Sequence, residues 1–222
     1  MTSLLSRELN DPRTQLYPIT VGQYHRMMRQ GIIEEGTPFE LLDGAIVRKD
    51  RSAQGEDPMT VGNEHIYCVA LLQRLDERLR RRGVHVRTQQ PISVPPVSEP
   101  EPDGAVVRGT IDDYASRLPQ SKDILFVVEV ADASLRRDRT TKLNLYARAA
   151  IAVYFIVNLP ERVIEMYSEP VRGKGTYART RVLKGSEKVR LPTGEGKTMA
   201  IAVRDLLPPA TSVPARRKRS AS

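Results

Sequence analysis

Glu129 is the residue whose setting in this sequence most clearly indicates chemistry. It lies within the apolar run Ile-Leu-Phe-Val-Val-Glu-Val at 124–130. An ionised carboxylate is costly to bury unless a cation compensates it, and that cation is either a basic side chain or a metal ion. Asp103 opens another short apolar run, and Glu40 lies in a third. Three carboxylates from separate strands could converge at one end of a sheet, and oxygen ligands favour Mg²⁺ or Mn²⁺ over zinc.

The competing interpretation is structural. Glu129 could pair with an arginine or a lysine that specifies the fold, and Asp103 and Glu40 could be ordinary acids at strand edges, because ion-pair networks place acids in such positions too. The spacing alone leaves both interpretations open.

Lys142 follows Glu129 by 142 minus 129, or 13, positions. On a helix that packs back across the sheet, its ammonium could offset the buried carboxylates and help to deprotonate an attacking water. The alternative is a surface pair with Asp138 four residues earlier, which contributes only about 0.3 to 0.5 kcal/mol. Tyr146 stands one turn further along, and we expect it to fill the core rather than to react.

Local signals predict the elements that would position these residues. Thr20 and Gln23 form a capping box for a short helix that ends at Gly31. Asp43-Gly44 between two apolar runs is typical of a hairpin turn, which places Glu40 on a strand. A helix is expected from Asn63, as its cap, to Arg82, since apolar residues recur there at steps of three and four.

The following segments predict a mixed α/β domain. We expect strands at 84–90, 103–107, 124–130 and 153–157, a helical turn from Thr110, and a helix from Asp138 to Ala150. The proline-rich stretch 91–102 must be an edge or a loop. A strand, a helix and a strand in sequence imply a right-handed crossover between parallel strands. Alternating segments at 163–167, 177–183 and 188–191 predict antiparallel ribbons at an edge.

Composition bounds the remaining possibilities. The 222 residues carry 35 Lys+Arg and 27 Asp+Glu, a net charge of +8, and Cys68 is the one cysteine. We expect one domain over 19–207, an extended arm over 1–18 and a disordered basic tail over 208–222. Four tail cations account for half of the excess, so the body's +4 permits a nucleic-acid partner without requiring one. One cysteine and the lack of an apolar span or signal segment predict a soluble cytoplasmic protein without disulfides.

Other motifs fail on inspection. Gly196-Lys197-Thr198 does not complete a P-loop, because the first glycine of that motif would fall on Leu191, and the following residues are typical of a strand. The sequence has no G-x-S-x-G motif. His25 and His85 have no second ligand at metal-binding spacing and are expected at the surface or in packing.

Several segments together carry a family resemblance. Pro102-Asp103, Glu129 and a following lysine resemble the PD-(D/E)XK nuclease superfamily, with the lysine moved from the strand to the next helix. FELLDGAIV, NEHIYCVALLQRL, SEPEPDGAVVRG and LFVVEVADASLRRDRTTKLNLYARAAIAVYFIVNL resemble the Uma-two family of bacterial endonucleases, also known as a domain of unknown function. The resemblance spans about 18–207 and implies a restriction-endonuclease-like core.

The resemblance also implies roles. Asp103 and Glu129 would bind the metal, Mg²⁺ or Mn²⁺, and Lys142 would be the catalytic lysine, since Ala131 occupies the superfamily's usual lysine position. Glu40 is similar to the family's additional acid, and His65 to the histidine that opens its long helix. The implied function is phosphodiester hydrolysis in nucleic acid, with DNA as the expected substrate and a homodimer as the expected assembly. The alternatives are a nucleic-acid-binding or regulatory protein that lost cleavage, and a dimeric structural or toxin-associated partner.

Overall fold

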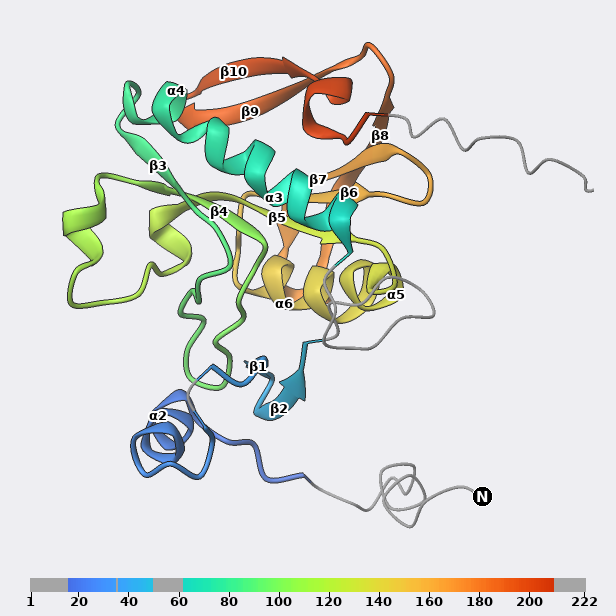
Figure 1. Cartoon of the computed structure of the whole chain (residues 1–222). Coiled ribbons are helices and arrows are strands. Elements are labelled where there is room, and N and C mark those ends of the chain that lie inside the picture. Colours follow the sequence, from blue (N-terminus) through green and yellow to red (C-terminus); the bar gives the residue numbers. More distant parts are fainter. Residues whose placement is uncertain (1–15, 35, 50–61, 210–222) are drawn as a thin grey trace, which may run out of the picture.

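A twisted six-stranded sheet organises the chain (Figure 1). The computed structural model describes residues 16–34, 36–49 and 62–209, so most of the expected arm 1–18 and tail 208–222 lies outside the described residues. The sheet has the order β3-β4-β5-β6-β7-β8. Its strands are β3 (Val84–Arg87), β4 (Gly104–Arg108), β5 (Ile124–Ala131), β6 (Val153–Asn158), β7 (Val163–Val171) and β8 (Thr176–Lys184).

Strand directions agree with the crossover expected from the sequence. β5 and β6 are parallel and are joined through a helical segment, and every other neighbouring pair in the sheet is antiparallel. β7 and β8 form the predicted edge ribbon. The segment 188–191 does not extend it: β9 (Lys188–Gly194) pairs with β10 (Lys197–Ala202) in a separate hairpin. Apolar residues of this hairpin pack against the sheet face, which explains the difference.

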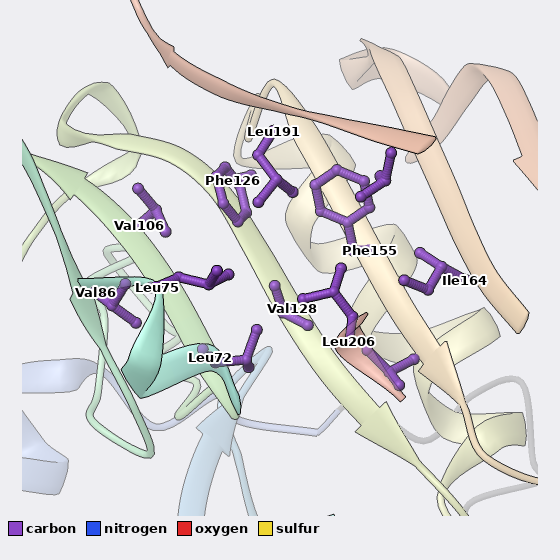
Figure 2. Close-up of a pocket in the computed structure, with 14 residues that line it drawn as sticks. Leu72, Leu75, Val86, Val106, Phe126, Val128, Phe155, Ile164, Leu191 and Leu206 are labelled. Carbon is purple, nitrogen blue, oxygen red and sulfur yellow. The ribbon is translucent and has the colours of Figure 1, made fainter. Parts of the chain in front are cut away.

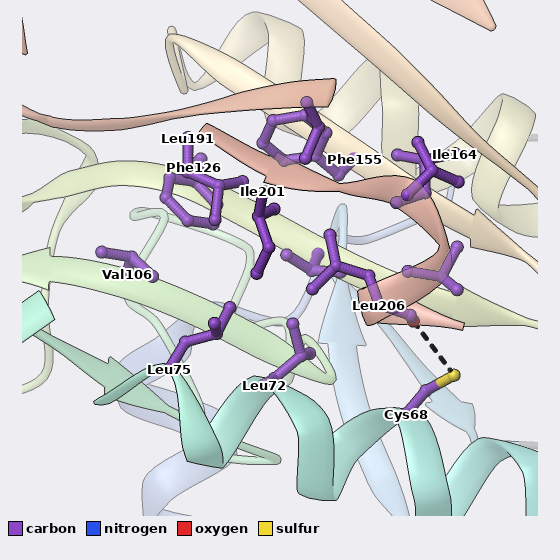
Figure 3. Close-up of a cluster of buried hydrophobic side chains, with 14 of the residues drawn as sticks. Cys68, Leu72, Leu75, Val106, Phe126, Phe155, Ile164, Leu191, Ile201 and Leu206 are labelled. Carbon is purple, nitrogen blue, oxygen red and sulfur yellow. Dashed lines mark hydrogen bonds between the residues drawn. The ribbon is translucent and has the colours of Figure 1, made fainter. Parts of the chain in front are cut away.

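One face of the sheet is covered by α3 (Asn63–Arg74) and by the β9–β10 hairpin. Figure 3 shows Leu72 and Leu75 of the helical segment and Leu191 and Ile201 of the hairpin around Phe126 of β5. The cavity among these side chains, shown in Figure 2, measures only about 20 Å³. It has room for about one water molecule, so this layer is a packed core and not a ligand site.

The long helix predicted over 63–82 is two helices. α3 ends at Arg74, Leu75 interrupts the helix, and α4 (Asp76–Arg80) follows. Asn63 is the first residue of α3 and not its cap: Gly62 holds that position without a side-chain hydrogen bond. The apolar periodicity persists through the break because Leu75 and Leu79 still face the core. None of the described helices is long and apolar enough to cross a membrane.

A helical segment over 135–148 covers the opposite face. It begins at Leu135, three residues before the expected Asp138, and consists of α5 (Leu135–Arg137), the π-helical turn η3 (Asp138–Lys142) and α6 (Leu143–Arg148). The wider π turn changes which side chains point inward, and such turns are frequent at functional sites.

Arg139 anchors the π turn to the sheet. Its guanidinium donates to both carboxylate oxygens of Glu165 on β7, at 2.6 to 3.2 Å. Asn158 and Tyr167 donate to the same carboxylate, at 2.8 and 2.6 Å. Glu165 is only 2% exposed, so a cation and these neutral donors together satisfy a buried charge.

The N-terminal layer contains α2 (Val21–Arg29) and the hairpin β1 (Phe39–Leu42) and β2 (Ala45–Arg48). The capping box at Thr20 and Gln23 is present, as predicted. Asp43 and Gly44 both have positive φ, 49° and 80°, as the hairpin turn requires. This hairpin sets Glu40 on β1, 1% exposed.

The Arg139–Glu165 contact should matter to stability more than an exposed pair on the same helical segment. Arg139→Met leaves a buried carboxylate without its cation and should lower the free energy of unfolding by about 2 kcal/mol. Arg148→Met is the matched control. It removes an exposed pair with Asp43 and should cost less than about 1 kcal/mol. Urea unfolding at pH 7 measures both, and equal losses would contradict the anchoring role.

Candidate active site

Strand register brings Asp103 beside Glu129. Gly104, the first residue of β4, pairs with Val128 of β5, so Asp103 lies next to Glu129 at the same end of the sheet. The backbone N–H of Asp103 donates to Glu129 Oε2 at 3.4 Å, and the N–H of Val130 donates to Asp103 Oδ2 at 2.9 Å. Both acids are buried, at 6% and 4% exposed, so two carboxylates lie side by side with little access to solvent.

Lys142 lies between two carboxylates of this cluster. Its Nζ donates to Glu40 Oε2 at 2.8 Å and to Glu129 Oε1 at 3.0 Å, and the side chain is 2% exposed. The expected alternative, a surface pair with Asp138, is wrong. The π turn instead directs the ammonium inward to acids that are 102 and 13 residues away in sequence.

His65 joins the cluster from the first turn of α3. Its Nε2 lies 3.1 Å from Asp103 Oδ1. Although burial favours neutral forms of both groups, this contact raises the pKa of His65 and lowers the pKa of Asp103 to about 2. The pair therefore favours an ionised Asp103 facing a protonated His65. Gly104 makes the approach possible, because a Cβ there would stand 2.9 Å from Leu72 Cδ1 of the same helix.

The pKa of Glu129 is shifted in the opposite direction from that of Asp103. Burial raises its pKa to about 7, the Lys142 ammonium opposes that rise, and the negative charges of Asp103, Asp138 and Glu40 add to it. Burial likewise raises the pKa of Asp138, whose carboxylate accepts the Ser134 hydroxyl at 2.6 Å. Lys142 thus faces several acids at once, and the cluster holds more buried carboxylates than the ammonium can neutralise.

Three contributors were missed or understated by sequence reasoning. Tyr146 is fully buried, as expected for core packing, but its hydroxyl also donates to Glu129 Oε1 at 2.7 Å. Asp138 adds a buried negative charge, and its helical spacing from Lys142 was the available signal. Lys49, 5% exposed, adds a positive charge that acts on Glu40 and Asp103. No periodic pattern in the sequence indicated its burial.

The donor chemistry of the cluster fits a hard divalent cation. Asp103, Glu129 and Glu40 offer only oxygen atoms, and Glu40 Oε1 is buried without a hydrogen-bond partner. In the described parts of the chain, no three His, Cys, Asp or Glu side chains are already grouped around one metal position. The carboxylates instead contact groups of the protein. Glu129 and Glu40 accept hydrogen bonds from Lys142, and Asp103 contacts His65 and the Val130 N–H.

Comparisons with known proteins give a family match and a fold match. The model of the Uma2 family, described as "Putative restriction endonuclease", matches residues 21–204. A solved structure from Anabaena variabilis, described as "a putative nuclease belonging to DUF820", superposes with a TM-score of 0.59. It is 16% identical, and the match covers 85% of this chain and 97% of that one. At this identity the likeness shows the fold alone. No curated protein matches.

The raised pKa of Glu129 predicts how stability depends on pH. The folded protein takes up a proton between about pH 4.5 and 7 that the unfolded chain does not hold. The free energy of unfolding should therefore fall as the pH rises through this window, by at most about 1.4 kcal/mol per pH unit from Glu129. The raised pKa of His65 acts in the same direction, from about pH 6.5 upward. Glu129→Gln removes its own contribution and should give a shallower profile.

Urea unfolding at half-unit steps from pH 4.5 to 8 measures the effect, with Asp112→Asn at an exposed position as the control. Parallel profiles for wild type and Glu129→Gln would contradict the raised pKa.

Proposed function

The chain belongs to the Uma2 family, described as "Putative restriction endonuclease", and from this premise we propose that it is a metal-dependent endonuclease. The proposed active site comprises Asp103, Glu129, Glu40, Lys142 and His65. One observation carries the proposal. Carboxylates from two adjacent strands and a hairpin outnumber the lysine that meets them, in a cluster almost closed to water. His65 and Lys49 add positive charge, but Glu40 Oε1 remains buried without a hydrogen-bond partner, which ion pairing alone does not explain.

We propose that Asp103 and Glu129 hold Mg²⁺ or Mn²⁺ and that Glu40 completes the set through its unpartnered Oε1. The bound ion would polarise the phosphoryl group and lower the pKa of a water molecule. The low pKa of Asp103 keeps that carboxylate ionised as a ligand. The higher pKa of Glu129 means that metal binding displaces a proton below about pH 7.

Lys142 and His65 provide the positive groups. The Lys142 ammonium stays charged because burial is outweighed by Glu129 and Glu40, which raise its pKa. It can stabilise the charge that develops on the phosphoryl oxygens. His65, held by Asp103, can orient a phosphate or donate a proton to the leaving oxygen. Tyr146 touches no reacting atom and acts as a positioning residue through its hydrogen bond to Glu129.

The proposed substrate is nucleic acid, with DNA favoured. Two copies related by symmetry are the simplest way to cut both strands of a duplex, so we propose a homodimer.

A nucleic-acid-binding protein without cleavage is the second candidate, and one set of contacts favours it. Glu129 accepts hydrogen bonds from Lys142, Tyr146 and the Asp103 N–H, and Asp103 contacts His65 and the Val130 N–H. These two carboxylates are therefore satisfied by the protein alone. A binder of this kind would need only phosphate contacts and would show no metal dependence in its stability.

Metal titration separates the two candidates. Mn²⁺ binds the folded state and should stabilise wild type by about 2.7 kcal/mol at 100 times its Kd. Glu129→Gln removes a ligand and should abolish both this stabilisation and cleavage of plasmid DNA, while Asp112→Asn should retain both. Thermal unfolding with and without Mn²⁺, beside a cleavage assay, makes the test. A wild type indifferent to Mn²⁺ would favour the binding protein.

Replacing the lysine should separate metal binding from cleavage. Lys142→Met leaves Glu40 and Glu129 without their shared cation and should lower the metal-free free energy of unfolding by about 3 to 5 kcal/mol at pH 8. Because the freed carboxylates attract a divalent ion more strongly, Mn²⁺ should restore part of that stability without restoring cleavage. Urea unfolding and the same cleavage assay give both readouts, and a variant that still cuts would remove Lys142 from the mechanism.

A further inference from the structure

A basic pocket lies at the end of the sheet away from the candidate active site. It has a volume of about 560 Å³ and lies between the end of the α4 segment, the end of β4 and the turn of the β9–β10 hairpin. Figure 1 shows α4, β3 and this hairpin close together. Arg81, Arg82, Arg108 and Lys197 line the pocket, and Glu195 is the one acid among the lining residues.

Two of these cations form no ion pair with a carboxylate of the described residues. Arg81 pairs with Glu77, and Lys197 pairs with Glu195 at 3.2 Å. Arg82 donates to the backbone carbonyl of Arg78, which carries no net charge. Neither Arg82 nor Arg108 forms an ion pair with any residue in the described part of the chain, and both are exposed.

Arg108 reaches across the pocket. A Cβ built on Gly194, in the hairpin turn, would stand 3.4 Å from Arg108 Nη1, so the guanidinium lies close to that turn. Val84, two residues after Arg82, pairs with Arg108 across β3 and β4. The strand pairing therefore brings the two unneutralised guanidinium groups to one hollow, where an anion can meet both.

The same elements connect this pocket with the candidate active site. β4 begins one residue after Asp103 and ends at Arg108, five residues later, which spans about 17 Å. The helical segment from His65 of α3 to Arg81, the C-cap of α4, is broken at Leu75 and spans at most about 24 Å at 1.5 Å per residue. Duplex DNA advances 3.4 Å per base pair, so about five to seven base pairs cover the separation.

We propose that this pocket binds a backbone phosphate of the nucleic-acid substrate, at least five base pairs from the bond that is cut. The inference rests on the proposed function, since it takes the acid cluster as the point of cleavage. Exposed guanidinium groups suit the phosphates of a nucleic-acid backbone, whose contacts with arginine and lysine fix the position of a duplex on a protein. The pocket would anchor the duplex without reading its sequence.

Binding measurements test the proposal directly. Arg82→Gln/Arg108→Gln removes both unneutralised charges. Arg172→Gln/Arg181→Gln is the matched control, because it removes two exposed arginines that also form no ion pair with the described residues. Fluorescence anisotropy with a labelled 30-base-pair duplex in EDTA measures affinity without cleavage. The pocket variant should bind about 60-fold more weakly at 0.1 M salt, and its slope of log K against log salt should be smaller by about 1.8.

The outcomes are separable. Equal affinities and slopes for wild type and pocket variant, or equal losses in both double variants, would overturn the pocket while leaving the proposed nuclease intact. If the pocket variant binds duplex more weakly than wild type, and wild type never cleaves with Mn²⁺, the pocket is supported and the nuclease is overturned. A wild type that binds no duplex would overturn both. Unchanged duplex binding with lost binding of inorganic phosphate would show a free-anion pocket and overturn the proposal.

Cleavage kinetics add a second readout. The pocket variant should raise KM for a long duplex by a similar factor and leave kcat unchanged, because neither arginine lies at the acid cluster. The difference in KM between wild type and the pocket variant should vanish when fewer than five base pairs separate the cut from the duplex end on the pocket side. A loss confined to kcat would show a structural effect on the acid cluster and overturn the anchoring role.

Discussion

An ammonium group with almost no access to water stands between two carboxylates from distant parts of the chain. Lys142 contacts Glu40 of the first hairpin and Glu129 of the central strand, and the geometry of the site follows from satisfying that charge. Without the lysine, the acids would repel one another in a poorly polarisable interior. Without either acid, the ammonium would be left with too little compensation. The hairpin, the sheet and the α5–η3–α6 segment therefore meet at one buried cation.

The α5–η3–α6 segment, which carries Lys142, contacts two glutamates that lie in register across neighbouring strands of the sheet. Glu129 pairs with Ile156, and Ile156 pairs with Glu165, so the two glutamates project from the same face of three neighbouring strands. Arg139 meets one and Lys142 meets the other, three residues apart on the π turn. A regular α-helix would rotate these side chains differently relative to each other, and the widened turn accommodates both contacts. The site thus uses a local irregularity to match a spacing that the sheet imposes.

Features set by contacts between neighbouring residues were predictable from the sequence, whereas features set by contacts between distant residues mostly were not. The Thr20 capping box, the Asp43-Gly44 turn and the buried strand around Glu129 depend on neighbouring residues, and all three are present in the structure. The break at Leu75 was not predictable from apolar spacing, which continues through it. The burial of Lys49 and the packing of the β9–β10 hairpin depend on tertiary contacts that leave no periodic pattern. The meeting of Glu40 with Lys142 was inferred only because an acid within an apolar strand requires a cation.

The sequence distance between Glu40 and Lys142 has a consequence for synthesis of the chain. The contact spans 102 residues, and Glu129 receives its counter-ion from residues that are made after it. An amino-terminal fragment ending before residue 142 therefore lacks the cation and holds its carboxylates in mutual repulsion. At 5 to 20 residues per second, roughly 5 to 20 seconds separate the appearance of Glu40 from that of its partner. The acid cluster cannot assemble on a ribosome until the crossover helix has emerged, so its high contact order delays the site until most of the domain exists.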